Sequence, residues 1–447
     1  MMRIVRGVMR ALRPRNLLAA LGVIVLTHVV VDQVLLVQAR EVEEEIRNKA
    51  PIKNTTGLYS SNNAAPLYLQ AYWLNGQTDR EVKEKYPQIK CPQASFYSLA
   101  LDGFPCGAKQ STPLSPEELE LYGEVIAAKQ PVYDLIAKAT ERPECEFNTS
   151  YAPELWNSAN YEGSTTLREM MRLLSDKARW NVRHGEVQGA WESVRQLLVC
   201  VKRAGGNGAI SGRLMQKSLF RIAASTIFDV ADQGPVPDSV TAAYFAPFRA
   251  ITDTRMALEA ARFETAMYVQ NIDLQMCLSA WGAWIRPLAS LGKLRTHEFY
   301  LQLQQALSQK TPMERMAAVK QVAEAEPVPT FFGVRLICPW RSMTTNPFPT
   351  FWHVYDLPDE LLISCRMIET GIALKQYKQR QGSYPQDLDT LAKDLPADTT
   401  IDPVTGKPFE YLMEGDGFIL KSPGPKALYG DKPGPFPPRD IVWQAKN

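Results

Sequence analysis

The sequence predicts a mainly α-helical protein with an N-terminal transmembrane helix, a helical and partly tetratricopeptide-like middle, and a small α+β module at its C-terminus. Three observations support this fold class: an apolar run near the N-terminus, a Pro-poor stretch with helical periodicity, and a hairpin pattern near the end. A length of 447 residues is enough for several folded units. The formal net charge of +2 gives no reason to expect a nucleic-acid partner.

Composition divides the chain into five parts. These are a basic cytoplasmic stub with a transmembrane anchor (1–40), a mixed loop-rich extracytoplasmic region (41–160), a helical domain (161–325), a Pro- and aromatic-rich linker (326–360) and an α+β module (361–447). Because proline interrupts helices, the uneven spread of the 32 prolines predicts loops in the second, fourth and fifth parts.

The N-terminal apolar run, from Leu17 to Val31, is preceded by arginines and by no acidic residue. The arginines are Arg3, Arg6, Arg10, Arg13 and Arg15. Extended to Val37, the run spans 21 residues, which is enough to cross a membrane. The charge asymmetry predicts a signal-anchor with the N-terminus in the cytoplasm and the bulk of the chain on the extracytoplasmic side of the membrane. A cleaved signal peptide is the alternative, with a cleavage site near Ala39, and it predicts the same location.

The seven cysteines fit an extracytoplasmic location but form no zinc motif, since the sequence contains no C-x-x-C. Two candidate disulfides and two buried thiols are predicted. The candidate pairs are Cys91 with Cys106 and Cys338 with Cys365, and the buried thiols are Cys200 and Cys277.

Between residues 40 and 140 the pattern predicts short helices joined by loops. Their ranges are 40–48, 64–74, 79–86 and 116–139. From Ser164 onward the helical periodicity is clear, and Gly185 separates two apolar stripes. The first stripe is Leu167, Met171, Leu174 and Ala178, and the second is Trp191, Val194, Leu198 and Val201. This hairpin resembles one tetratricopeptide-type unit, because small residues flank its turn. Further helices are predicted at 209–231, 238–282 and 296–324, the middle one interrupted by Pro247.

The last part of the chain predicts a helix followed by a small sheet. The apolar face of the helix, which runs to about residue 381, consists of Leu361, Cys365, Ile368 and Ile372. A short second helix is predicted within 383–396, then a hairpin with strands at 409–412 and 418–421, and a third strand at 441–443. Positive φ is expected at Gly406, in the turn before the first strand, and at Gly415 or Gly417 in the hairpin turn. A bare hairpin cannot bury its apolar face alone, so we expect the helix to pack against the sheet.

The motifs of this part occur in one fixed order: G-x-Y-P, D-P-x-x-G-x-P, S-x-G and D-I-x-W. The residues concerned are Gly382, Tyr384, Pro385, Leu388, Leu391, Leu395, Pro396, Asp402, Pro403, Gly406, Pro408, Tyr411, Ser422, Gly424, Asp440 and Trp443. Because these motifs occur in this order, roughly the last 80 residues resemble the globular part of the major pseudopilins of type II secretion. The whole chain looks similar to uncharacterised membrane-anchored envelope proteins of bacteria, and that resemblance implies no activity.

The chain departs from the pseudopilin pattern in two ways. A pseudopilin has its apolar polymerisation helix directly before this module, whereas the helix here contains charged residues and the apolar segment lies more than 300 residues upstream. The charges are Arg366, Glu369, Lys375 and Lys378. The loop that holds calcium in the family offers only Asp431 and Asp440 here, too few for a site of hard oxygen ligands. We therefore expect neither polymerisation nor calcium binding.

Reactive motifs are absent from the sequence. The Gly-rich stretch 205–212 follows a helix rather than a strand, which predicts a connection between helices and not a phosphate loop. Among four histidines, His353 lies in an aromatic setting near Asp356 and Asp359, but a lone histidine is more typical of packing than of catalysis. We assign no catalytic, cofactor-binding or metal-binding residue.

The sequence therefore predicts a non-catalytic protein-binding or scaffold protein of the envelope. Its expected partners are the membrane, through the N-terminal helix, and other envelope proteins, with a type II secretion-like assembly as the specific candidate. The alternative is an envelope hydrolase or carbohydrate-binding enzyme with a site in the aromatic-rich region 331–356.

Overall fold

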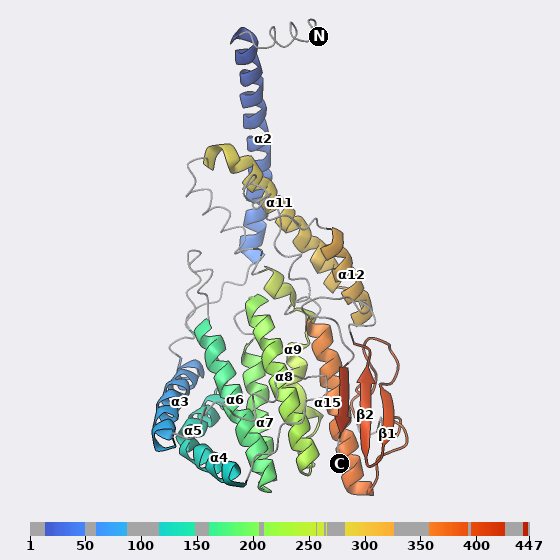
Figure 1. Ribbon diagram of the computed structural model, residues 1–447. Helices are drawn as coiled ribbons and strands as arrows, with labels where there is room; N and C mark the ends of the chain where they lie inside the picture. The colour runs from blue at the N-terminus through green and yellow to red at the C-terminus, as the bar shows by residue number, and fades with distance from the viewer. Residues whose placement is uncertain are drawn as a thin grey trace, which may run out of the picture. The chain divides into compact units, whose positions relative to one another are not determined.

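The structure is a computed structural model that describes part of the chain. The described residues are 14–49, 60–86, 116–147, 161–204, 210–255, 257–262, 265, 282–325, 357–391, 395–424 and 441–445. Contacts divide the chain into two compact units. The first consists of Met1–Pro51, Ala261–Gln305 and Gln321–Trp352, and the second of Ile52–Ala260, Ala306–Lys320 and His353–Asn447. Most described residues are helical, and one small antiparallel sheet lies near the C-terminus, as predicted (Figure 1).

The first unit is built on α2 (Pro14–Lys49) and most of α11 (Gly282–Leu307). The apolar run and the helix predicted at 40–48 form one continuous helix of 36 residues. The ring nitrogen Nε2 of His297 on α11 lies 3.4 Å from Oε2 of Glu45 on α2. In the part of the chain that the structure describes, no helix is both long enough and apolar enough to cross a membrane. The predicted transmembrane helix is therefore not supported by the structure.

The second unit begins with α3 (Ala65–Lys85), α4 (Pro116–Ala128) and α5 (Gln130–Thr140). The two helices predicted at 64–74 and 79–86 are one helix, because no proline separates them and the intervening Asn75-Gly76 pair is itself helical. The helix predicted at 116–139 is instead two helices, with Lys129 between them and Pro131 in the first turn of α5. This break places Lys129 in the interior, where the residue is 5% exposed.

The predicted helical hairpin is confirmed by α6 (Tyr161–Arg183) and α7 (Val187–Ala204), and α8 (Ile210–Gln233) packs against both (Figure 1). Gly185 forms the turn with a φ of 78°, a backbone conformation that favours glycine. Every residue of the two predicted apolar stripes is buried. Polar residues also join α6 to α8, since the Ser175 and Thr226 hydroxyl groups lie 2.7 Å apart in the core.

The helices that follow are shorter than predicted. In place of one helix beginning at 238, the structure has the 3-10 helix η4 (Ala242–Phe245) and α9 (Ala246–Ile251), and Pro247 lies in the first turn of α9. Residues 254–255, 257–262 and 265 of the predicted helix are helical, and residues 266–281 lie outside the described residues. The helix predicted at 296–324 is divided between α11 and α12 (Pro312–Ala325). Thr311 and Glu314 exchange side chain to backbone hydrogen bonds of 3.1 and 3.2 Å, which form a capping box at the start of α12.

The C-terminal module consists of α15 (Leu357–Gln381) and strands β1 (Glu410–Glu414), β2 (Gly417–Ser422) and β3 (Ile441–Ala445). The strands form an antiparallel sheet in the order β1-β2-β3, which confirms the predicted hairpin and third strand. Gly406 before β1 and Gly415 in the hairpin turn have positive φ, as predicted. The prediction of a short second helix is wrong for residues 383–391, which form bends and turns.

The module shares one core with the helical bundle. α15 packs against α8 and α9 as well as against β2 and β3 (Figure 1). The Trp443 ring stacks on Phe228 of α8 with ring centroids 4.2 Å apart. Gly371 on α15 leaves room for Trp443, because a Cβ at this position would lie 1.7 Å from the ring. Cys365 is a free buried thiol within this core, so the pairing predicted for it with Cys338 is wrong.

The four charged residues of α15 that set it apart from an apolar polymerisation helix each have a partner. Arg249 of α9 pairs with Glu369, and Asp232 of α8 lies 2.6 Å from the Lys375 ammonium. Arg366 and Lys378 donate hydrogen bonds to the carbonyl oxygens of Ile401 and Asp416. These charges therefore fix α15 in the unit.

Candidate functional site

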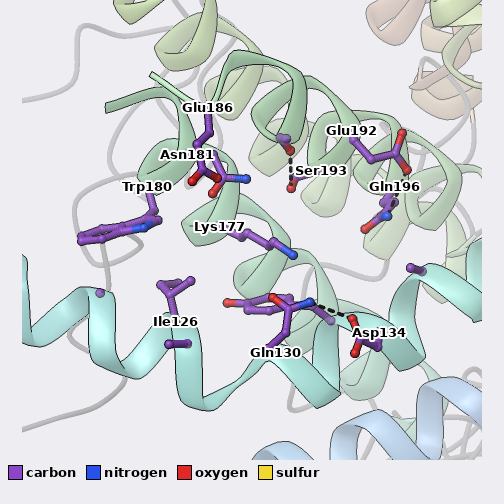
Figure 2. A pocket seen from close by; sticks show the side chains of 15 residues that line it. Ile126, Gln130, Asp134, Lys177, Trp180, Asn181, Glu186, Glu192, Ser193 and Gln196 are labelled. Atoms are coloured by element: carbon purple, nitrogen blue, oxygen red, sulfur yellow. Dashed lines mark hydrogen bonds between the residues drawn. The ribbon is translucent and has the colours of Figure 1, made fainter. Parts of the chain in front are cut away.

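A groove of about 390 Å³ lies between α4 and α5 on one side and α6 and α7 on the other (Figure 2). We call it the α4–α7 groove. Its lining combines apolar and aromatic side chains with amides, carboxylates and one lysine. Those used below are Gln130, Tyr133, Asp134, Lys177, Trp180, Glu186, Glu192, Ser193 and Gln196. No sequence motif predicted it, because its lining comes from four helices.

Lys177 of α6 reaches into the middle of the groove (Figure 2). Its ammonium lies 4.4 Å from the centroid of the Tyr133 ring, which is a cation–π contact. Partial burial lowers the pKa of Lys177, and the carboxylates of Asp134, Glu186 and Glu192 oppose this shift. The desolvation effect is larger than the attraction of the three carboxylates, so the net shift of the Lys177 pKa is downward.

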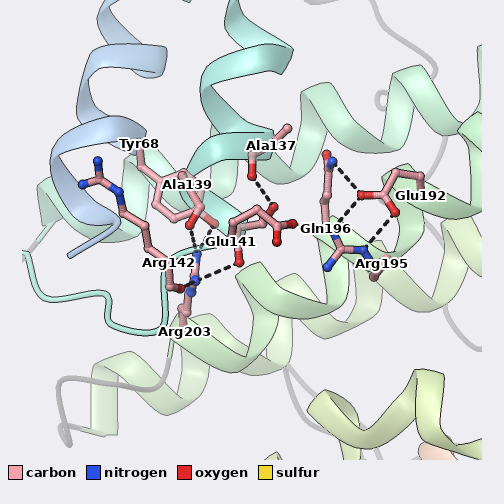
Figure 3. Close-up of polar contacts among 10 residues, drawn as sticks. Tyr68, Ala137, Ala139, Glu141, Arg142, Glu192, Arg195, Gln196 and Arg203 are labelled. Atoms are coloured by element: carbon pink, nitrogen blue, oxygen red, sulfur yellow. Dashed lines mark hydrogen bonds and ion pairs between the residues drawn. The ribbon is translucent and has the colours of Figure 1, made fainter. Parts of the chain in front are cut away.

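Several other polar groups of the groove already have hydrogen-bond partners. Gln130 Nε2 donates to Asp134 Oδ1 over 2.7 Å, and Ser193 Oγ donates to the Gly189 carbonyl over 2.9 Å. Glu192 accepts hydrogen bonds from Arg195 and Gln196, as Figure 3 shows. A hydroxyl or carboxylate that is fixed in this way is poorly placed to act as a nucleophile or a base.

One end of the groove is fixed by Arg203 at the C-terminus of α5 (Figure 3). The Arg203 guanidinium donates to the carbonyl oxygens of Ala139, Thr140 and Arg142, and also to the Tyr68 hydroxyl over 2.7 Å. A cation at this position satisfies the terminal carbonyl groups and the negative end of the helix dipole. Arg203 thus joins α3, α5 and α7 into a rigid frame.

The thiols beside this frame are unreactive. Cys200 lies 3.5 Å from the Tyr68 hydroxyl, and burial raises its pKa. Burial likewise raises the pKa of Cys145 to about 12. Since the thiolate is the nucleophile, neither thiol is suited to catalysis. The prediction that Cys200 is a small buried core residue is confirmed.

Most of the residues considered for chemistry from the sequence lie outside the part of the chain that the structure describes. His353, Asp356 and the whole region 331–356 lie outside the described residues, as do Cys91, Cys106, Asp431 and Asp440. Asp359 is described, and it pairs with Arg315 at the start of α15. His184 stacks on Trp180 with centroids 3.7 Å apart, which is a packing role. Among the described residues, no group of three His, Cys, Asp or Glu could hold a metal ion.

Comparisons of the chain with models of protein families, with curated proteins and with solved structures find no match.

Proposed function

We propose that this protein is a non-catalytic protein-binding or scaffold protein that holds a partner segment in the α4–α7 groove. The observation that carries the proposal is the groove lining, where the Lys177 ammonium lies over the Tyr133 ring among polar groups of which several already have partners. Such a lining offers hydrogen bonds, aromatic surface and one charge, which suits recognition. The rigid frame around it limits the conformational entropy lost on binding.

The proposed location is the periplasmic side of a bacterial inner membrane, with α2 in contact with the lipid. The charge asymmetry around Leu17 to Val31 supports this orientation. A second support is the exposure of apolar side chains on α2, which carries eight of the fourteen large hydrophobic residues that are exposed in the described part of the chain. Contiguous exposed apolar surface indicates a contact with a membrane or another protein.

The proposed partner is a type II secretion-like assembly, on the basis of the pseudopilin-like motifs. Their packing supports the resemblance, because Ser422 of the S-x-G motif donates to Asp402 of the D-P-x-x-G-x-P motif over 3.0 Å. Asp402 also accepts from the Val404 amide, and Ser422 accepts from the Gly424 amide. The two motifs therefore act as one structural unit.

The test of binding is capture of partners from solubilised membranes by the full chain, with identification by mass spectrometry. Lys177→Met keeps the aliphatic stem over Tyr133 but removes the charge, and Lys202→Met on exposed α7 surface is the matched control. We expect the first variant to weaken capture of a specific partner by about tenfold and the control to leave it unchanged. Equal capture by both variants and the wild type would contradict the proposal.

The location is tested separately by a topology reporter fused after Asn447. The proposed orientation predicts activity of a reporter that works only in the periplasm. A reporter active only in the cytoplasm would exclude this location without bearing on the groove.

A further inference from the structure

A buried polar cluster lies where α3, α4, α5 and α6 meet, directly behind the Tyr133 side of the groove. Asn75, Lys129, Tyr133 and Asp176 are each at most 6% exposed, and Asp79 completes the cluster. The Lys129 ammonium lies 2.7 Å from Asp79 Oδ1, and Asn75 Nδ2 donates to Asp79 Oδ2 over 3.2 Å. One of the two carboxylates is therefore paired.

Four buried atoms of this cluster have no hydrogen-bond partner within the described residues: Asn75 Oδ1, Asp79 Oδ1, the Tyr133 hydroxyl and Asp176 Oδ1. Of these, Asp79 Oδ1 is compensated by its ion pair with Lys129. The Tyr133 hydroxyl interacts electrostatically with both Asp176 and Asp79, and Asn75 donates to Asp79, so these groups belong to one cluster. A buried polar atom without a partner is unfavourable, because it has lost its hydrogen bonds to water. Native proteins meet this cost with ordered water or with a proton on the carboxylate.

The charges around Asp176 leave it poorly compensated. Arg179, its nearest cation, is held by Asp229 over 2.6 Å and by Ser175 over 2.6 Å. Lys129 is paired with Asp79, and Tyr122 supplies one side-chain hydrogen bond. Glu169 on the same helix adds a negative charge. Burial raises the pKa of Asp176 to about 7, against the lowering effects of Arg179, Tyr122 and Lys129.

We propose that this cluster is a proton-binding site in which Asp176 takes up a proton near neutral pH and ordered water links it to the Tyr133 hydroxyl and to Asn75. Loss of the proton leaves an anion in the interior and loosens the packing of α5 on α6. Because the Tyr133 ring is also the surface beneath Lys177, the protonation state is transmitted to the groove. This property goes beyond the proposed partner binding and holds whether or not that binding exists.

The direction of the pH effect follows from linkage. The pKa of Asp176 is raised in the folded state above its usual value near 3.8. The protonated site therefore contributes its full stability below about pH 4, and that contribution is lost as the pH rises through about 7.

The experiment measures the thermal unfolding midpoint of the full chain between about pH 5 and pH 8. Asp176→Asn keeps the shape of the side chain and removes its titration, and Asp238→Asn at an exposed position is the matched control. We expect the midpoint of the wild type and of the control to fall over this range, and Asp176→Asn to lose most of that fall. An unchanged slope in Asp176→Asn would overturn the proposal.

Two further measurements test the site if Asp176→Asn does not fold. Infrared difference spectra of the wild type between about pH 6 and pH 8.5 are expected to lose the carbonyl band of a protonated carboxylic acid. Tyr133→Phe removes a hydroxyl that stabilises the ionised form through water, so we expect it to move the midpoint of that band upward by about 0.5 pH unit. The absence of the band at pH 6, or a midpoint that Tyr133→Phe leaves in place, would each overturn the proposal.

Discussion

Two long helices of this protein, α2 and α15, use their apolar residues in opposite ways. Valines of α2 such as Val23 and Val34 are 64% and 54% exposed. On α15 the predicted apolar face is fully buried, and even the charged residues Glu369 and Lys375 are at most 8% exposed. In the described part of the chain, α15 packs against α8, α9, η4, β2 and β3, which belong to its own unit.

This difference shows that the charged residues of α15 are part of a core helix. A charged side chain is stable in the interior only when a partner of opposite charge is held beside it. Arg249 and Asp232 supply those partners from α9 and α8. The apolar surface of α2, by contrast, has no comparable set of contacts in the described residues that covers Val23, Leu26 or Val30.

The largest expected effect on α15 comes from Trp443→Ala. The Trp443 side chain is 2% exposed and contacts both Phe228 and Phe418. We expect the free energy of unfolding to fall by about 4 kcal/mol because a large cavity forms between the sheet and the bundle. Urea unfolding followed by circular dichroism measures the change. A loss below about 1 kcal/mol would show that the module does not share a core with the bundle.

A smaller loss is expected for Gly371→Ala, which places a methyl group against the Trp443 ring. Overpacking of this kind costs about 1 to 3 kcal/mol. Gly76→Ala on α3 is the matched control, because nothing lies within 4 Å of its added Cβ and a helical alanine there is expected to be neutral or slightly stabilising. Equal thermal midpoints for the two variants would mean that α15 and Trp443 are not in close contact.

Breaking one buried ion pair is expected to have the next largest effect. Arg249→Ala leaves the Glu369 carboxylate buried without its partner, and we expect a loss of about 2 kcal/mol, since the arginine itself is partly exposed. The double variant Arg249→Ala, Glu369→Leu removes the unpaired charge and is expected to recover most of this stability. A double variant that is no more stable than the single one, by chemical denaturation, would argue against a fixed pair.

The smallest effect on folding is expected on α2. Val30→Ser and Val34→Ser replace exposed side chains, so the free energy of unfolding should change by less than about 0.5 kcal/mol. The same substitution at Val194, which is fully buried in α7, is the control for a core position. If α2 contacts lipid, the two α2 variants lower the fraction of protein that sediments with membranes. A large loss of stability in either variant would place these valines in a core.

The parts of the fold that the sequence predicted depend on local signals. The apolar face of α15, the hairpin and the glycines at 185, 406 and 415 follow from periodicity and backbone conformation within a few residues. The breaks at Lys129 and before Thr311 were missed, although Pro131 and Pro312 mark both. Proline in a first turn starts a new helix as readily as it interrupts one.

The groove and the proton-binding cluster could not be predicted in this way. Asp176 and Lys177 are consecutive residues of one helix, yet one faces the interior and the other the groove. Arg179 meets Asp229 across 50 positions of sequence, and Lys129 meets Asp79 across another 50. Pairings over such separations follow from the packing of whole helices and leave no motif in one sequence.

Hydrogen exchange of the full chain before and after Trp443→Ala tests most directly whether the C-terminal module and the helical bundle form one cooperative core. Amides of α8 are the ones to follow, because Phe228 of this helix stacks on Trp443. Their protection should fall together with that of α15, β2 and β3, since a shared core opens as one unit. Unchanged protection in α8, with losses confined to α15 and the sheet, would show that the module is instead an independent domain.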